Sequence, residues 1–425
     1  MNLFAHPMRF LKSSYTFCLV LIIVCNSCNH AENSTSHYSV NASINTEQQS
    51  VTVDVDIAYL PSKATKSIEF IAHENVMIQS CTANGLLNYS EKGKANKAKV
   101  VTLQFEKEIA TPLTIRFEYT FVLKKEDAPW GIDKISEDWI ELSLNSGWLP
   151  IIATYNNQFT SQTELEIVSK NEFSILSSGT SQAVGSNKFS ITNTTPQIDL
   201  VLIGSSQFQE SRKEHISIFE NQENKERNEF IFIFSEKSYQ WLNNTFGEVK
   251  KIPPVKLVIT PRTESGYARK NFIVLSNDIS AKDTLHFVNY ITHEFAHFWS
   301  TGANPVSEHR WLDESIAEYI AWKYVEMNYS EAKRNEFLAK AKKEADTIAP
   351  VYIIGVSKVP SHAVMYRKGV YKLFKLEEMI GEEEMFSLLS DWFKVENKNS
   401  EIFLEHLKII AGVQTADSFR LELSK

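Results

Sequence analysis

Cysteine is almost missing from this sequence beyond its first thirty residues. Three of the four cysteines, Cys18, Cys25 and Cys28, lie near the N-terminus, and only Cys81 follows them. The remainder of the chain therefore cannot form an internal disulfide or a cysteine-based metal cluster. Because Cys81 falls in a region of expected strands, we expect it to be a small, buried apolar residue.

Clusters of basic residues are also lacking. The 425 residues carry a formal net charge of −8, and no stretch gathers lysine and arginine side chains. Nucleic-acid binding is therefore not expected. The apolar and charged fractions, 43% and 23%, are ordinary for a globular protein, and the length suffices for two domains with sizeable cores.

No apolar run is long enough to cross a bilayer comfortably. The longest near the N-terminus, residues 15–25, follows two basic residues and has the length of a secretory signal core. It ends before Asn-Ser-Cys, which resembles the bacterial lipoprotein signal, in which the cysteine is acylated. We therefore expect a signal peptide at 1–28, a polar tether at 29–36, and a lipid anchor on Cys28 that holds the protein to a membrane of the bacterial cell envelope. A secreted or periplasmic protein is the alternative.

Residues 37–208 alternate apolar and polar side chains, which is the pattern of half-buried antiparallel strands. They contain no repeat of fixed period and no catalytic set of residues. We expect a β-sandwich-like domain that forms one wall of an active cleft. Its expected strands cover residues 38–44, 51–57, 101–105, 113–121, 165–168 and 198–203.

From residue 209 to 425 the pattern changes to a small sheet followed by helices, an α+β arrangement. Strands are expected at 229–234, 255–260 and 271–276, with a helix at 238–246 between the first two. Beyond residue 281 the pattern is almost entirely helical. Asp283 is placed to cap the first of these helices. The overall expectation is an α+β protein of two domains.

The motif that most strongly indicates a chemical function is H-E-F-A-H. It begins at His293, within an apolar run of helical spacing. Residues four apart lie on one helix face, so His293 and His297 can direct their imidazole nitrogens at one ion. Glu294 stands beside them, where its carboxylate can reach a water molecule on that ion. Imidazole and carboxylate ligands favour zinc, which in catalytic sites takes three protein ligands.

A third ligand is expected from a second helix, at residues 311–319. The intervening chain contains Gly302 and an Asn-Pro pair, which suffice to end one helix and turn the chain back antiparallel. Glu314 is then the third ligand of a single zinc ion per chain. Glu318 lies one turn later on the same face and is expected to accept the remaining ring N–H of a ligand histidine.

Three motifs in this order resemble the membrane alanyl aminopeptidase family of gluzincin zinc metallopeptidases. They are H-E-F-A-H, W-L-D-E-S-I-A-E-Y at 311–319 and M-Y-R-K-G-V-Y-K-L-F at 365–374. The resemblance extends from about residue 37 to the end of the chain. It implies a thermolysin-like catalytic domain after an all-β domain, without the C-terminal helical domain of larger members. It also implies that Glu294 is the general base and that Tyr366 stabilises the transition state.

One departure from the family concerns the substrate's amino terminus. Family members carry G-x-M-E-N on an edge strand, where the glutamate holds the free amine, and residues 265–271 stand in its place here. Gly266 and Tyr267 are expected to contact the substrate backbone. Arg269 and Lys270 lie near the position of the missing glutamate and would repel an ammonium group. We therefore expect weak activity on single-residue aminoacyl amides and better activity on longer or N-blocked peptides.

A zinc-dependent peptidase acting on peptides or proteins is the function that these residues indicate, with aminopeptidase and endopeptidase action both open. The alternative is a lipid-anchored peptide-binding module with a zinc site that does not turn over, which Ser315 in place of the family glycine also suggests. His286 is expected to be a packed core histidine. No partner is evident for His309 or His362.

Overall fold

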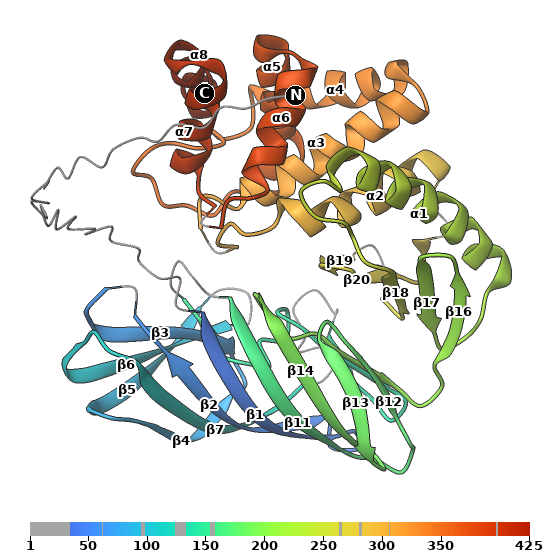
Figure 1. Ribbon diagram of the computed structural model, residues 1–425. Coiled ribbons are helices and arrows are strands. Elements are labelled where there is room, and N and C mark those ends of the chain that lie inside the picture. The colour runs from blue at the N-terminus through green and yellow to red at the C-terminus, as the bar shows by residue number, and fades with distance from the viewer. Residues whose placement is uncertain are drawn as a thin grey trace, which may run out of the picture. The chain divides into compact units, whose positions relative to one another are not determined.

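The computed structural model describes most of the chain beyond the N-terminal segment (Figure 1). The described residues are 35–61, 63–94, 98–123, 133–153, 158–262, 266–279, 283–305, 307–396 and 398–425. The expected signal peptide and lipidated Cys28 lie outside these ranges, as does most of the expected tether. Within them, no helix combines the length and the apolar character needed to cross a bilayer.

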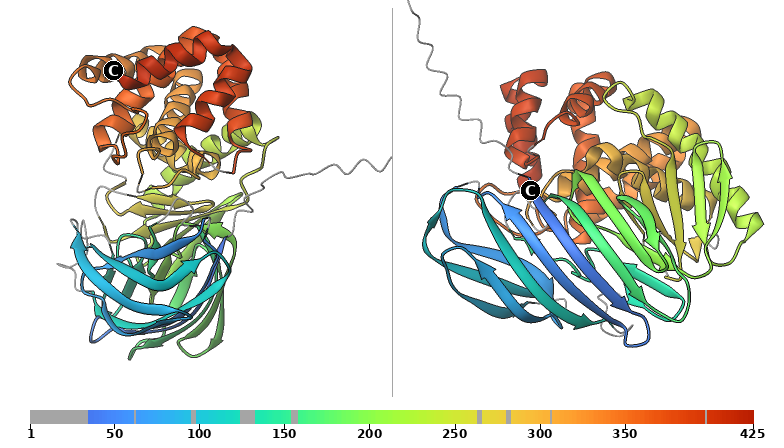
Figure 2. Two further views of the ribbon diagram at one scale, coloured as in Figure 1. Left: turned by 90° about the vertical axis from the view of Figure 1, so that its left-hand side faces the viewer. Right: turned by 60° about the horizontal axis from the view of Figure 1, so that its bottom comes forward.

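A seven-stranded sheet dominates the described part of the N-terminal half, and Figures 1 and 2 show its strands side by side. Alternating burial in β1, β2 and β7 places every second side chain in the core, as the sequence predicted. One pair departs from the antiparallel expectation, because β1 and β11 run parallel over ten residue pairs. In spatial order the strands are β13 (Thr180–Gly185), β14 (Lys188–Gln197), β11 (Phe159–Val168), β1 (Ser36–Asn45), β2 (Ser50–Tyr59), β7 (Leu113–Val122) and β4 (Met77–Ala83).

Two four-stranded sheets accompany the large one. The first packs against it through a shared apolar core, in which the rings of Phe70 and Phe117 meet edge to face at 5.1 Å. This face-to-face packing confirms the sandwich-like expectation. The first sheet contains β10 (Ile151–Ile152), β3 (Thr65–His73), β6 (Ala98–Ile109) and β5 (Leu86–Lys94); the second contains β12 (Ser174–Ser177), β15 (Leu202–Ser205), β9 (Trp139–Leu142) and β8 (Lys134–Ile135). Cys81 on β4 is half-buried rather than buried.

A five-stranded mixed sheet begins the C-terminal half, with β19 at its edge. Its strands are, in spatial order, β16 (Gln209–Lys213), β17 (Ile216–Glu220), β18 (Val255–Thr260), β20 (Phe272–Ser276) and β19 (Tyr267–Arg269). The strands expected at 255–260 and 271–276 are therefore confirmed. An apolar cluster joins β9 and β15 to this sheet through side chains such as Trp139, Val258 and Phe272.

The strand expected at 229–234 is wrong, because these residues belong to helix α1 (Lys225–Phe246). Alternating phenylalanine and isoleucine in this stretch has the composition and period of a strand. Asn224 instead caps a helix by accepting from the backbone N–H of Arg227. Ile231 and Leu242 are fully buried on the face that packs into the core, so tertiary burial outweighs the local preference.

Helices make up most of the chain after β20, as expected. The helices are α2 (Thr284–Ser300), α3 (Trp311–Asn328), α4 (Glu331–Ala345), the π-helical η3 (Val364–Gly369), α5 (Val370–Ile380), α6 (Glu382–Trp392), α7 (Ser400–Ala411) and α8 (Val413–Ser424). The last two, red in Figure 1, lie side by side. Helices α2 and α3 make one of the most extensive helix contacts of the molecule, and this contact builds the site.

Candidate metal centre

Helix α2 carries the two histidines of the H-E-F-A-H motif. Asp283 begins the helix by accepting from the backbone N–H of His286, which is the expected cap. His293 and His297 lie one turn apart on a face that packs against α3, and both are almost fully buried. Their Nε2 atoms are 3.1 Å apart, so the two rings converge on one point.

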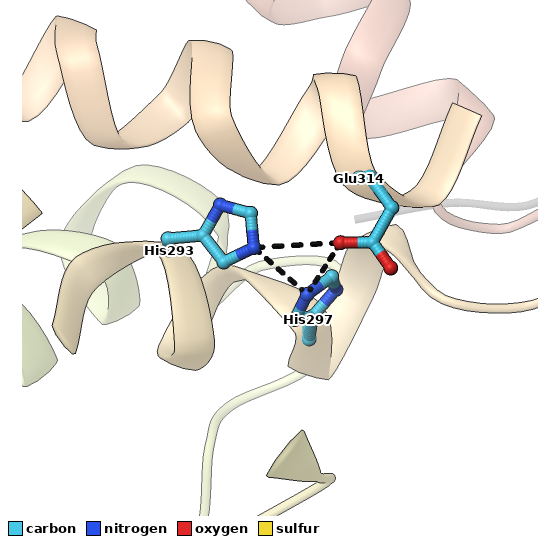
Figure 3. Close-up of side chains that lie close together, drawn as sticks. All are labelled: His293, His297 and Glu314. Carbon is cyan, nitrogen blue, oxygen red and sulfur yellow. Dashed lines mark hydrogen bonds and ion pairs between the residues drawn. The ribbon is translucent and has the colours of Figure 1, made fainter. Parts of the chain in front are cut away.

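Helix α3 brings Glu314 to the same point, as Figure 3 shows. Glu314 Oε2 lies 3.6 Å from His293 Nε2 and 3.5 Å from His297 Nε2. Zinc bonds of 2.0–2.1 Å in a tetrahedral arrangement place ligand atoms roughly 3.3 Å apart. The three atoms therefore form a triangle of the size that a zinc ion requires, and the two imidazoles and one carboxylate suit its chemistry.

Glu318 lies behind His293 and holds its ring. Glu318 Oε2 is 2.8 Å from His293 Nδ1, and Oε1 accepts from Trp322 Nε1 at 2.7 Å and from Asn289 Nδ2 at 3.1 Å. Burial opposes ionisation of Glu318, but the contact with His293 lowers its pKa overall. A charged acceptor at Nδ1 favours the tautomer that keeps Nε2 free for a metal.

Glu294 is adjacent to His293 and lines the cavity, but it is not one of the three converging ligand groups. Its Oε2 atom is buried and has no hydrogen-bond partner among the residues that the structure describes. Burial raises the pKa of this carboxyl above its ordinary value, which suits a group that must take up a proton. A buried acceptor without a partner, beside a metal site, is where a water molecule is expected.

Tyr366 reaches the site from η3, a π-helical turn of the kind often found at functional sites. Its hydroxyl lies 2.5 Å from Glu314 Oε2, and burial holds its pKa well above the ordinary value, so it stays a donor. The tyrosine ring stacks on two imidazoles, with its ring centroid 4.2 Å from that of His362 and 5.4 Å from that of His293. His362 therefore has a partner that the sequence did not reveal.

Ser315, the substitution noted in the ligand helix, supports the turn that carries Tyr366. Its hydroxyl donates to the backbone carbonyl of Met365 at 2.6 Å. Gly369 makes room for it, because a Cβ atom there would lie 2.1 Å from Ser315 Oγ. The serine is thus fitted to this π-helical turn rather than disruptive to the site.

A cavity of about 430 Å³ opens in front of the triangle. One wall comes from helices α2 and α3, the π-helical turn η3 and strand β19, and another from loops of the β-rich half that include Asn145 and Gly147. This agrees with the expectation that the first domain shapes part of a cleft. Glu294, Glu314 and Tyr366 all line the cavity.

Gly266 and Tyr267 line the same cavity at the edge strand β19. Gly266 is tightly enclosed, because a Cβ atom would lie 1.7 Å from Tyr290 Oη. The Tyr267 ring lies between two guanidinium groups, 4.8 Å from that of Arg262 and 5.1 Å from that of Arg269. Within the described residues β19 is the last strand of its sheet, and such an edge beside a cavity can add an extended peptide as another strand.

The two cations expected near a substrate amine do not both lie free in the cleft. Arg269 forms a two-point ion pair with Asp199 of the β-rich half, with one contact at 3.0 Å, so its charge is largely offset. Lys270 occupies the turn after β19 with φ of 59° and is not among the residues lining the cavity. The structure therefore does not support repulsion by two free cations as a reason to expect poor amine recognition. Glu264, a carboxylate two residues before Gly266 that could hold a substrate amine instead, lies outside the described residues.

The other histidines fall outside the triangle. His286 is exposed near the start of α2, so the expectation of a packed core histidine was wrong. His309 is buried, with Nδ1 3.0 Å from Ser400 Oγ. The sequence did not lead us to expect Asn289 and Trp322, which donate hydrogen bonds to Glu318. Their spacing signals them, because each lies four residues from His293 or Glu318 and so shares its helix face.

Comparison with known proteins finds similarity at the level of structure. No family model matches the chain, and no curated protein sequence does. An M1 zinc metallopeptidase from Deinococcus radiodurans matches with a TM-score of 0.68 and 13% identity, over 91% of this chain and 93% of that one. Leukotriene A4 hydrolase from Saccharomyces cerevisiae matches with a TM-score of 0.69 and 15% identity, over 92% of this chain and 67% of that one. The chain therefore has the fold of the M1 zinc metallopeptidases.

Proposed function

We propose that this protein is a zinc-dependent peptidase. The observation that carries the proposal is the triangle of His293, His297 and Glu314, whose ligand atoms are 3.1–3.6 Å apart. Glu294 and Tyr366 border the same cavity with a buried acceptor and a buried donor. Ligands, base and donor together form the set of groups that metal-assisted hydrolysis requires.

The chain's own groups divide the work of hydrolysis. A zinc ion held by the three ligands would supply a Lewis acid that polarises the scissile carbonyl and acidifies water. Glu294 takes the proton of the attacking water and passes it to the leaving nitrogen. Tyr366 donates a hydrogen bond from its hydroxyl to the oxygen on which negative charge develops. The β19 edge aligns the substrate backbone with these groups.

The solved structures support this assignment through their shared fold. A mutant of the Deinococcus enzyme is known bound to a Tyr-Ser-Ala substrate, and it matches this chain with 14% identity and a TM-score of 0.67. A short peptide is therefore a reasonable substrate class for the cavity of this chain. Membership of the membrane alanyl aminopeptidase branch, in a short form, remains part of the proposal.

Cleavage position depends on whether a carboxylate anchors the amine. The described carboxylates that line the cavity are Glu294, Glu314 and Asp313, and the first two belong to the metal chemistry. Both oxygens of Asp313 accept backbone N–H groups, from Gly302 and Ala303. With no described carboxylate free for an ammonium group, we propose better activity on longer or N-blocked peptides than on aminoacyl amides.

A direct test compares one peptide with a free and with an acetylated amino terminus. We expect kcat/KM for the two to differ by less than about tenfold. A hundredfold preference for the free amine would show that an anchor exists. If Glu264→Gln then abolished that preference, Glu264 would be the anchor.

The decisive experiment for the function uses zinc content and a base-deleted variant. Purified protein is expected to hold about one zinc per chain, and a peptide pool analysed by mass spectrometry should show cleavage products. Glu294→Gln should retain zinc and lose nearly all hydrolysis, because only the base is removed. Wild-type rates in this variant would refute the mechanism. Zinc and peptide binding without any product would instead support the binding module.

Envelope anchoring is proposed on the N-terminal signal alone. We expect the full-length chain in a bacterial host to enter the membrane fraction and to carry lipid on Cys28. Cys28→Ser should release it into the soluble fraction, with the peptidase activity retained. Equal release of both proteins would favour the secreted or periplasmic alternative.

A further inference from the structure

Three arginines line the cavity, and two of them form ion pairs with carboxylates of the protein. Arg262 pairs with Glu141, and both side chains are at most 2% exposed. Arg269 pairs with Asp199 through two contacts. Because each pair joins the catalytic half to the β-rich half and is buried, its charges are balanced without a substrate.

Arg310 differs from the other two. Its side chain is 39% exposed, and its one ion pair among the described residues is a contact of 3.3 Å with Glu314 Oε1. The other oxygen of Glu314 faces His293, His297 and the Tyr366 hydroxyl. Since that carboxylate belongs to the candidate metal centre, Arg310 has no separate counter-ion among the residues that the structure describes.

Arg310 lines the cavity, and its guanidinium has more donors than its contact with Glu314 uses. An arginine carries five N–H donors in a planar fork that matches a carboxylate at two points. The contact with Glu314 uses one of them. No other carboxylate lining the cavity is within ion-pair distance of Arg310 in the described part of the chain.

We propose that Arg310 binds a carboxylate of the substrate close to the scissile bond. This inference rests on the proposed peptidase function and names its substrate class, peptides with a negative group near the cleaved bond. Arg310 is one turn from Glu314 and contacts it directly, so it lies beside the metal centre. A peptide residue spans about 3.3–3.6 Å, which places the recognised group one or two residues from the bond.

Two sources can provide this carboxylate, and matched peptides separate them. One series exchanges glutamate for glutamine at each position around the cleaved bond. The other compares a C-terminal acid with the C-terminal amide of a short peptide. If Arg310 binds an acidic side chain, kcat/KM differs between the members of the first series. If it binds the C-terminal carboxylate, kcat/KM differs in the second series.

The measured quantity is the ratio of kcat/KM between the charged and neutral members of each pair. A charge-assisted two-point contact predicts a ratio of about 10 to 100 in the wild-type protein. Arg310→Gln should reduce that ratio to about 1, and Arg310→Lys should retain part of it. Arg212→Gln, an exposed arginine on β16 outside the cavity lining, is the control and should leave the ratio unchanged.

A purely structural Arg310 would give a different result. If it only steadied Glu314, Arg310→Gln would slow both members of every pair equally, and the ratio would survive. An unchanged ratio in the variant, or a ratio near 1 in the wild-type protein, overturns the inference.

Peptide binding keeps the inference testable if no peptide is cleaved. Zinc-loaded Glu294→Gln protein, with and without Arg310→Gln, is titrated with the same pairs by calorimetry. Tighter binding of the charged member that disappears with Arg310→Gln supports the carboxylate site even though the peptidase proposal has failed. Equal binding of both members, or binding of neither, overturns the inference itself.

Discussion

Replacing Glu318 by glutamine tests how the protein prepares His293 for a metal. Oε1 of Glu318 accepts from both Trp322 and Asn289, whereas Oε2 lies 2.8 Å from His293 Nδ1. In Glu318→Gln, the two donors at the Oε1 position require the carbonyl oxygen there. The amide NH₂ group must then face His293 Nδ1, where the carboxylate had accepted a hydrogen bond.

This change favours the wrong tautomer of His293. An NH₂ donor at Nδ1 keeps the ring proton on Nε2, which is the atom that faces His297 and Glu314. Metal binding then forces two donors together, or breaks the bonds to Trp322 and Asn289. A buried unsatisfied donor costs about 1–3 kcal/mol, so zinc affinity should fall on the order of 10- to 100-fold.

Competition for zinc against a chromophoric chelator at neutral pH measures this loss directly. Glu377→Gln is the matched control, because Glu377 is a half-buried acceptor for Tyr319 and Lys323 that does not contact a ligand. We expect the control to hold zinc as the wild-type protein does. A zinc dissociation constant for Glu318→Gln within twofold of wild type would refute the tautomer argument.

Three further predictions address catalysis, packing and pH. Tyr366→Phe should lower kcat by about 10²- to 10³-fold with little effect on KM or zinc content, because one oxyanion donor is lost; unchanged kcat would contradict its role. Gly369→Ala should destabilise the protein by about 1–3 kcal/mol, because the new Cβ atom would clash with Ser315 Oγ. Adding Ser315→Gly should restore part of the lost melting temperature. If the melting temperature does not recover, the steric explanation is contradicted. Hydrogen bonds from Lys372 and neighbouring lysines lower the pKa of Glu422 to about 2. Its stabilisation is therefore present above the ordinary carboxyl pKa and is lost as pH falls toward 2, so the urea-midpoint difference between wild type and Glu422→Gln should shrink from pH 7 to pH 3; a constant difference would contradict the shift.

Much of the candidate site could be predicted because its geometry is local. The four-residue spacing of His293 and His297 places both rings on one helix face in any α-helix. The turn residues around Gly302 were sufficient to predict that the chain reverses and that a second helix brings Glu314 beside the first. The alternating strands of the first half were equally readable, since the side-chain period of a strand is also a local property.

The local sequence pattern was not sufficient to predict secondary structure where a strand period and a helix period overlap. Residues 230–234 alternate aromatic and β-branched side chains, and yet they lie in α1. The stretch is helical because Ile231 and Leu242, more than two turns apart, bury the same helix face against the core. Only the packed molecule decides such a conflict.

By itself, the sequence determined which groups share a helix face or a strand face, because those distances follow from backbone geometry. Tertiary structure alone decided which charged side chains form ion pairs. Arg269, for example, pairs with Asp199, which is 70 residues away in the sequence. It also paired Arg310, within the described part of the chain, only with Glu314 of the candidate metal site, and it stacked Tyr366 on His362 and His293. Pairing and burial join residues far apart in sequence, and local spacing carries no record of such contacts.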